Sequence, residues 1–294
     1  MLSYRHGYHA GNPADLLKHS ISLQILSSLQ LKEKGYCYFD THAGAAWYDL
    51  CHNFAQKTKE HLAGAQRLYS LSQSQISHPS LIAYQELLIQ FNQTMGEIHS
   101  SNDDKPKTPG APHSLRYCPG SPAIALIKQR QQDDTVLCEL HNNEFKNLRH
   151  NTHRLKPIIS GRLALHHRDA YEAMAALLPP EKKRALILID PSYESRDEVQ
   201  HLQINLRKAL QRFSHGVYAI WYPVLEGINP IATLRQQSWL QAFETQLYEI
   251  QIPSNTRYGR MNATGMLIIN PPWHAQQALQ GIDVALTTIL SAGH

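Results

Sequence analysis

The sequence lacks most features that mark secreted, membrane-spanning or metal-binding proteins. Its four cysteines, at positions 37, 51, 118 and 138, form no CxxC pair, which favours buried free thiols in a reducing, cytoplasmic setting over a disulfide framework. No apolar run approaches the roughly eighteen residues of a spanning helix, and no apolar signal-peptide core is expected at the N-terminus. The eighteen histidines include no HExxH pattern and no Cys/His set with zinc spacing, so no metal site is expected.

Glycine-rich phosphate loops are also missing. Neither GxGxxG nor GxxxxGK[ST] occurs, so a dinucleotide or ATP is not favoured as ligand. A formal net charge of +4 is compatible with a polyanionic partner but does not identify one. The 294 residues suffice for one large α/β domain, or for one domain that carries an insertion.

Strand and helix patterns alternate along most of the chain. A helix is expected over residues 13–32, capped by Asn12, and a strand over 36–40 follows it. Further strands are predicted at 135–140, 162–167, 185–190, 217–224, 243–252 and 265–272. Further helices are predicted at 121–130 (with Ser121 as its cap), 143–152, 171–178, 196–213 and 230–242. Nearly continuous apolar strands in this order predict an α/β fold with a mostly parallel sheet covered by helices on both faces.

One segment interrupts this alternation. Residues 47–97 have helical, amphipathic patterns, and residues 99–114 form a polar, proline-rich loop. We therefore expect an inserted helical subdomain over residues 47–113, within a domain made of residues 1–46 and 114–294.

Four of the predicted strands end in an acid: Asp40, Glu139, Asp169 and Asp190. An acid after a strand often just caps the next helix, but parallel strands bring their carboxyl ends to one crevice, where ligands bind. Four acids there favour a nucleoside-type ligand, with Glu139 accepting bonds from two ribose hydroxyls. Gly44, in the turn DTHAGAA, permits close approach of the backbone. Without a phosphate cradle, S-adenosylmethionine is the favoured nucleoside.

The motif DPSY at residues 190–193 suits methylation of an exocyclic adenine amine, whose lone pair is delocalised into the ring. The carboxylate of Asp190 and the backbone carbonyl of Pro191 can accept bonds from the two N–H groups and favour a pyramidal nitrogen. The Tyr193 ring is expected to stack on a base that is flipped out of its helix.

The chain resembles the RlmJ-type 23S rRNA adenine N6-methyltransferases over nearly its whole length. The resemblance rests on MLSYRHGYHAGNPADLLKH, YFDTHAGA, YCPGSPAIA, CELH, LILIDPSYE, YAIWYPV and GMLIINPPW. It implies a Rossmann-like class I S-adenosylmethionine-dependent methyltransferase with a small inserted helical subdomain. The implied substrate is a single adenine of 23S rRNA, adenine 2030.

The resemblance also implies roles for individual residues. Asp190 is the implied catalytic residue, and Tyr4 an implied contact to RNA. Lys18 is expected near the methionine end of the cofactor. Cofactor contacts are implied or expected for His19, Asp40, His42, Gly44, Ser121, Glu139, Asp169, Ala170 and Asp190. The alternative for His19 is a purely structural histidine whose hydrogen bonds are made within the protein. The alternative for Ser121 is a helix N-cap with no role in binding.

Two positions depart from the family pattern. Ser192 replaces the second proline of DPPY. Ala170 replaces a glycine, and an alanine at this position calls for a backbone with negative φ. Arg257 and Arg260, in a loop expected over residues 254–265, are candidate RNA contacts, and an ordinary solvated loop is the alternative. No protein partner is expected, and the protein is expected to be a monomer.

Two other functions stay open at this point. A DNA adenine N6-methyltransferase would share Asp190 to Tyr193, but it normally needs a separate sequence-reading domain, and none is visible. A catalytically weakened RNA-binding homologue is the other alternative, because of Ser192 and Ala170.

Overall fold

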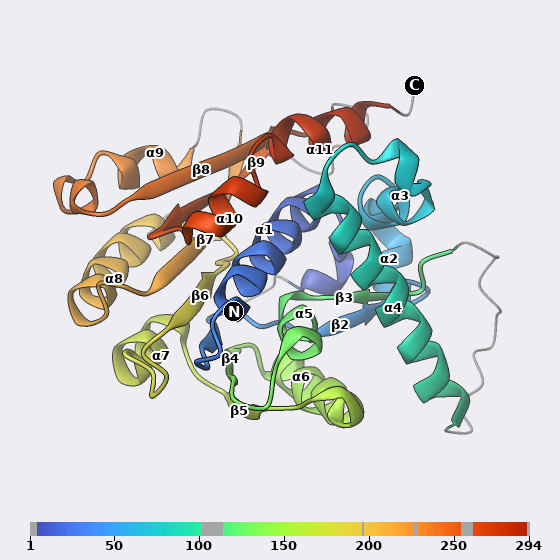
Figure 1. Cartoon of the computed structure of the whole chain (residues 1–294), viewed down its shortest axis with the longest axis horizontal. Coiled ribbons are helices and arrows are strands. Elements are labelled where there is room, and N and C mark those ends of the chain that lie inside the picture. Colours follow the sequence, from blue (N-terminus) through green and yellow to red (C-terminus); the bar gives the residue numbers. More distant parts are fainter. Residues whose placement is uncertain (1–4, 102–113, 196, 226–228, 254–260, 293–294) are drawn as a thin grey trace.

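A seven-stranded sheet forms the centre of the computed structural model, which describes residues 5–101, 114–195, 197–225, 229–253 and 261–292. The strand order is β5-β4-β1-β6-β7-β9-β8 (Figure 1). The strands are β1 (Cys37–Asp40), β4 (Asp134–Cys138), β5 (Arg162–His166), β6 (Ala185–Ile189), β7 (Val217–Leu225), β8 (Thr245–Gln251) and β9 (Met261–Ile269). The five strands β5, β4, β1, β6 and β7 are parallel to one another, and β9 runs antiparallel to both of its neighbours, β7 and β8. The order reverses at β1, so the carboxyl ends of β1 and its neighbours border the crevice where ligands bind in such sheets.

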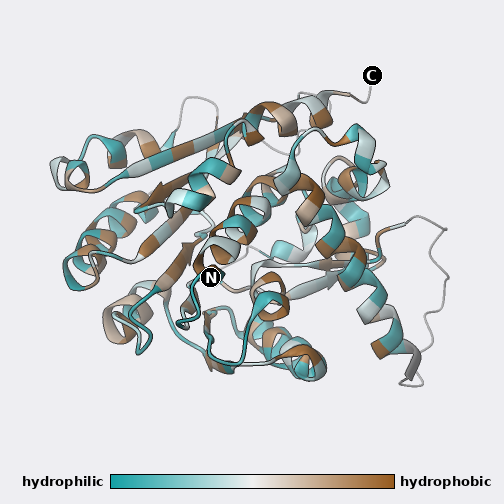
Figure 2. Cartoon of the chain, viewed as in Figure 1, coloured by the Kyte–Doolittle hydropathy of each residue, from teal (hydrophilic) through white to brown (hydrophobic). Residues whose placement is uncertain are grey.

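Helices cover both faces of this sheet, as the alternating pattern predicts. One face packs against α1 (Pro13–Gln30), α5 (Ser121–Lys128), α6 (Asn142–Arg154), α10 (Trp273–Ala278) and α11 (Ile282–Ser291). The other packs against α7 (Ala170–Leu177), α8 (Glu198–Arg212) and α9 (Pro230–Arg235). Figure 2 shows the consequence in colour: β6 is brown along its length, whereas α8, with one side to solvent, alternates between teal and brown.

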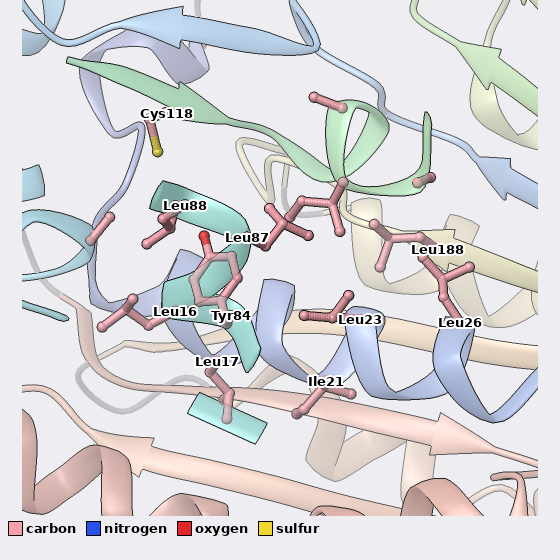
Figure 3. Packing of buried hydrophobic residues seen from close by; sticks show 14 of the residues in the cluster. Leu16, Leu17, Ile21, Leu23, Leu26, Tyr84, Leu87, Leu88, Cys118 and Leu188 are labelled. Carbon is pink, nitrogen blue, oxygen red and sulfur yellow. The ribbon is translucent and has the colours of Figure 1, made fainter. Parts of the chain in front are cut away.

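Helix α1 is buried along most of its length. The side chain of Asn12 accepts a bond from the Asp15 amide and Pro13 occupies the first turn, as expected, and the helix ends at Gln30, two residues before the predicted end. Leucines and isoleucines of α1 pack against Tyr84, Leu87 and Leu88 of α4 (Pro79–Ser101), as Figure 3 shows. Because α1 lies between the sheet and α4, its polar residues are held in a buried setting.

The segment predicted to be wholly helical begins with a strand instead. β2 (Trp47–Asp49) pairs antiparallel with β3 (Tyr117–Pro119), and only then follow α2 (Asn53–Thr58), α3 (Ala65–Ser70) and α4. The helical prediction was therefore wrong at residues 47–49. Three residues are too few to reveal a period of two, and their partner lies about seventy positions further along the chain.

Several other boundaries differ from the sequence-based expectation. Residues 261–265, expected in a loop, belong to β9, where they pair with β7 and β8. The helix expected over 230–242 is divided into α9 and a short 3-10 helix, Ser238–Ala242. α10 and α11 were not anticipated. The expectation of buried thiols holds for Cys37, Cys118 and Cys138, whereas Cys51 is exposed.

No helix within the described residues combines the length and the apolar character needed to cross a membrane.

The backbone just before α1 packs directly against the backbone at the start of α3. Gly11 accepts a hydrogen bond from the Ala65 amide, at 2.7 Å. A Cβ at Gly64 would lie 2.1 Å from the Gly11 carbonyl oxygen and 2.5 Å from the carbonyl carbon of Asn12. Only glycine permits this approach, which fixes the entry of the chain into α1.

Replacing Gly64 with alanine is therefore expected to lower the free energy of unfolding by about 1–3 kcal/mol, the usual cost of overpacking against atoms that cannot move. Gly96→Ala is the matched control, because nothing lies within 4 Å of a Cβ at that position in α4. This control should raise stability by about 0.5–1 kcal/mol through helix propensity. Urea unfolding measures both changes, and equal effects from the two substitutions would contradict the packing argument.

Candidate active site

A cleft at the carboxyl ends of the parallel strands encloses about 1110 Å³ of space, its open mouth included. Residues predicted from the sequence that line it are Lys18, His19, His42, Gly44, Ser121, Glu139, Asp169, Ala170, Asp190 and Pro191. Residues that sequence reasoning missed include His6, Tyr48, His141, Glu144, Glu198 and Trp221. The cleft thus gathers residues from positions 6 to 221 of the chain.

Glu139, just after β4, is tied to the turn that follows β1. Its Oε2 accepts a bond from the Gly44 amide at 2.8 Å, and its Oε1 accepts one from the His141 amide at 2.7 Å. Gly44 has φ +57, a left-handed backbone that favours glycine, and a Cβ there would lie 2.5 Å from the Tyr48 hydroxyl oxygen. Two backbone donors hold the carboxylate in one orientation at the edge of the cleft.

Asp40 lies beneath the cleft and does not line it. It is fully buried and accepts bonds from the Tyr38 and Ser121 hydroxyls, both at 2.7 Å, and from the His42 amide at 3.1 Å. Burial raises the pKa of Asp40 despite these three donors. The expectation that all four strand-end acids point into one crevice is therefore correct for three of them and wrong for Asp40.

Ser121 is the first residue of α5, and Gly120 occupies the cap position. Ser121 as a plain helix cap was therefore a wrong prediction, since its hydroxyl donates to Asp40 instead. That bond fixes the N-terminus of α5 at the wall of the cleft.

Asp169 caps α7 and lines the cleft at the same time. Its Oδ1 accepts from the amides of Tyr171 and Glu172, at 2.9 Å and 3.1 Å. Ala170 is the first helical residue, with the negative φ that an alanine favours. Capping and cleft lining, posed as alternatives for such acids, are both true here.

Lys18 is buried between two carboxylates. Its Nζ lies 2.6 Å from Asp190 Oδ2 and 2.9 Å from Asp15 Oδ1. Burial by itself would lower the pKa of Lys18, but the two carboxylates outweigh it and raise that pKa. Burial would likewise raise the pKa of Asp15, yet neighbouring His6, Lys18 and His19 bring it well below its ordinary value. The ion pair ties helix α1 to the end of β6.

His19 is 1% exposed and is hydrogen-bonded through Nδ1 to the Tyr84 hydroxyl, at 2.9 Å. It is thus a satisfied helix histidine, and it also lines the cleft. Burial, helped by the charges of Lys18 and His6, lowers its pKa from an ordinary 6.5 to about 3. His19 is therefore neutral at physiological pH.

Tyr193 does not line the cleft. It has φ +53, its hydroxyl donates to the backbone carbonyl of Trp221 at 2.7 Å, and its ring packs against the core on the α8 face of the sheet. Asp190, Pro191 and Ser192 do line the cleft, and the aromatic ring beside them belongs to Trp221. Trp221 stood in the quoted segment YAIWYPV, but only the pleat of β7 decides which of its aromatic rings faces the cleft.

Tyr4, Arg257 and Arg260, the candidate RNA contacts, lie outside the described residues. Within the described part of the chain, no group of three or more histidines, cysteines and acids could hold a metal ion.

The strand order, the antiparallel β9 and the acids that follow β4, β5 and β6 around one cleft define a class I S-adenosylmethionine-dependent methyltransferase. A family model described as "RsmJ: Ribosomal RNA large subunit methyltransferase D, RlmJ" matches residues 33–294. The chain belongs to this family.

Curated relatives cover nearly the whole chain. "Ribosomal RNA large subunit methyltransferase J" of Escherichia coli is 35% identical over 96% of this chain and 91% of its own length. The protein of the same name from Haemophilus influenzae is 36% identical over 99% and 94%. A crystal structure of a Legionella pneumophila protein, 30% identical, has a TM-score of 0.74 and covers 97% of this chain and 95% of its own.

The cofactor of this class is S-adenosylmethionine, and the residues present fit it. An open cleft at the strand ends, a glycine that lets the backbone approach, and an oriented carboxylate just after β4 match the needs of a nucleoside ligand without phosphates.

The pKa of His19 gives a pH prediction. The folded-state pKa of His19 lies below the unfolded value of 6.5. The contribution of neutral, buried His19 to the free energy of unfolding is therefore complete above pH 6.5 and is lost as the pH falls towards 3. Below pH 6.5, unfolding free energy should fall by an extra ~1.4 kcal/mol per pH unit in the native protein relative to His19→Gln. Urea unfolding at a series of pH values measures the difference in slope. Exposed His274→Gln is the control, and it should keep the native slope.

Proposed function

We propose that the protein transfers a methyl group from S-adenosylmethionine to the exocyclic N6 of a single adenine in 23S rRNA, adenine 2030. The observation that carries this proposal is the position of Asp190 and Pro191 in the wall of the cleft, with an aromatic ring beside them. The names of the curated relatives, which act on large-subunit ribosomal RNA, support the choice of substrate.

S-adenosylmethionine supplies an electrophilic methyl group on its sulfonium sulfur. On the protein side, Asp190 and the Pro191 carbonyl accept bonds from the two N–H groups of the amine, which draws its lone pair out of conjugation. Lys18 already binds Asp190 Oδ2, so Oδ1 is the oxygen proposed to face the amine. Lys18 holds this carboxylate in place, and Asp190 accepts the proton as charge develops on nitrogen.

Cofactor binding is proposed to use the groups fixed around the cleft. The Glu139 carboxylate, oriented by the Gly44 and His141 amides, would accept the two ribose hydroxyls. Asp169 and Ala170 would contact the nucleoside at the start of α7, while Ser121, His42 and His19 line the remaining wall. Asp40 would act from below by holding Ser121 and the His42 amide.

Helix α6 offers a surface for a polyanion beside the cleft. His141 caps the helix and lines the cleft, and Lys146, Arg149, His150 and His153 lie on its exposed face. The acid of the helix, Glu144, is buried and faces the cleft instead. An exposed face with cations and no carboxylate suits RNA phosphates.

Residues 47–113 are proposed to form a subdomain that supports the N-terminal segment. The Tyr8 and Phe54 rings lie 4.6 Å apart, and His9 Nδ1 lies 2.7 Å from Glu60 Oε1. These contacts hold the segment in which His6 reaches the cleft. We further propose that the protein works as a monomer in the cytoplasm, without a protein partner.

Incubation with labelled S-adenosylmethionine and unmodified 23S rRNA, intact large subunits or DNA, followed by nucleoside analysis, tests the proposal. N6-methyladenosine in the rRNA supports it. Transfer only to DNA would establish the DNA enzyme instead, and absence of transfer to any substrate would favour a weakened RNA-binding homologue.

Asp190→Asn and Asp190→Ala should lower kcat by at least ~100-fold, the usual contribution of a positioned acid or base. Cofactor affinity, measured by calorimetry, should change little, because Asp190 is proposed to act on the amine. Asp197→Asn, an exposed change in the same segment, is the control. Near-native turnover of the Asp190 variants would remove this residue from the mechanism.

The double variant Lys146→Ala/Arg149→Ala should raise the KM for rRNA and flatten its dependence on salt. Each lost phosphate contact reduces the slope of log affinity against log salt by about 0.7–0.9. Arg207→Ala/Lys208→Ala removes the same charge from the exposed face of α8 and serves as control. If both double variants behave alike, α6 is not an RNA-binding surface.

A further inference from the structure

The turn that follows β1 has a strained backbone next to the cleft. Gly44 has φ +57 and Ala46 has φ +68, so both lie in the left-handed region. A glycine adopts this region at little cost, whereas an alanine is disfavoured there. Ala46 is also fully buried. A conformation of this kind persists only where surrounding groups hold it, so the contacts around Ala46 decide the shape of the turn.

The side chain of Asn151, near the end of α6, makes two of these contacts. Its Nδ2 donates to the Ala45 carbonyl at 2.8 Å and to the Trp47 carbonyl at 3.2 Å, so the two bonds lie on either side of Ala46. The Ala46 carbonyl itself accepts a bond from the Gly120 amide at 2.8 Å. Both N–H groups of one amide side chain are therefore used to hold the strained part of the turn.

The same turn forms part of the wall of the cleft. The Gly44 amide donates to Glu139 Oε2 at 2.8 Å, and Glu139 is the proposed acceptor for the ribose hydroxyls. Helix α6 begins just after Glu139, and its cap, His141, lines the cleft with both residues. Helix α6 thus contacts the cofactor side of the cleft twice: its start adjoins Glu139, and Asn151 holds the turn that binds Glu139.

We propose that Asn151 is a positioning residue for cofactor binding. The proposal rests on the proposed contact of Glu139 with the ribose and deepens it by naming the group that fixes the turn opposite. While Asn151 holds the turn, the Gly44 amide stays directed at Glu139 before any ligand binds. Without Asn151, Ala46 can relax to a negative φ, and only a fraction of the molecules keep a turn that is competent to bind. The apparent affinity then falls by that fraction.

Two variants at this position test the proposal by calorimetry with S-adenosylhomocysteine, which carries the same nucleoside and has no methyl group to transfer. Asn151→Ala should raise its Kd by about 5–10-fold, which corresponds to the net value of about one hydrogen bond. Asn151→Leu fills the space and lacks the donors, and it should give the same rise. Asn147→Ala, at an exposed asparagine of the same helix, is the control and should keep the native Kd. A native Kd for both Asn151 variants would overturn the proposal.

A compensating substitution tests whether Asn151 acts through the turn. Glycine adopts a positive φ without help from a side chain, so Ala46→Gly/Asn151→Ala should bind S-adenosylhomocysteine more tightly than Asn151→Ala alone. A general loss of folding in Asn151→Ala would not be repaired by a glycine. If the double variant binds no better than the single one, Asn151 does not act through the turn and the proposal fails.

Steady-state kinetics give an independent readout. Asn151→Ala should raise the KM for S-adenosylmethionine and keep the native kcat at saturating cofactor, because Asp190 and Pro191 are unchanged. A fall in kcat with a native KM would contradict a role in cofactor positioning. Failure of the proposed function is distinguishable from this: the native protein would bind S-adenosylhomocysteine more tightly than Asn151→Ala does, yet transfer no methyl group to 23S rRNA.

Discussion

The buried ion pair between Lys18 and Asp190 is the interaction on which the rest of the site depends. It joins α1, near the N-terminus, to the end of β6, 172 residues later in the chain. A buried charge without any partner costs several kcal/mol, and the carboxylates of Asp15 and Asp190 both pair with the buried ammonium of Lys18 where α1 meets the end of β6. The same pair orients Asp190 at the end of β6. The Lys18–Asp190 ion pair therefore serves both the stability of the fold and the proposed chemistry.

Around this pair, the cleft is built from groups that are fixed before any ligand binds. Backbone amides hold Glu139, a helix start holds Asp169, and buried Asp40 anchors Ser121 and the turn after β1. Preorganised polar groups need no reorganisation during the reaction, which is where an enzyme of this kind gains most of its rate. His19 extends the principle, because its burial keeps it neutral beside a lysine.

The aromatic wall of the cleft follows from the pleat of β7, and the charged surface beside it follows from the exposed face of α6. Alternation along β7 places Trp221 on the α1 face and its aromatic neighbours in the opposite core. The helical period of α6 turns Leu148 and Thr152 inward and leaves its cations outside. The same local rules thus turn one aromatic ring into the cleft and one set of charged side chains to solvent.

The sequence by itself determined the doubly wound sheet, the capped first helix and the three acids that reach the cleft. These follow from local physics: apolar strands, helix caps and the rule that parallel strands share a carboxyl edge. Only the tertiary structure decided that Asp40 lies beneath the cleft, that Ser121 donates to it, and that Trp221 rather than Tyr193 lines the cavity. The short β2–β3 pair and the junction of Lys18 with Asp190 were likewise beyond a sequence pattern. In each case the partner lies tens to hundreds of residues away, and the burial that fixes the contact exists only once the chain has folded.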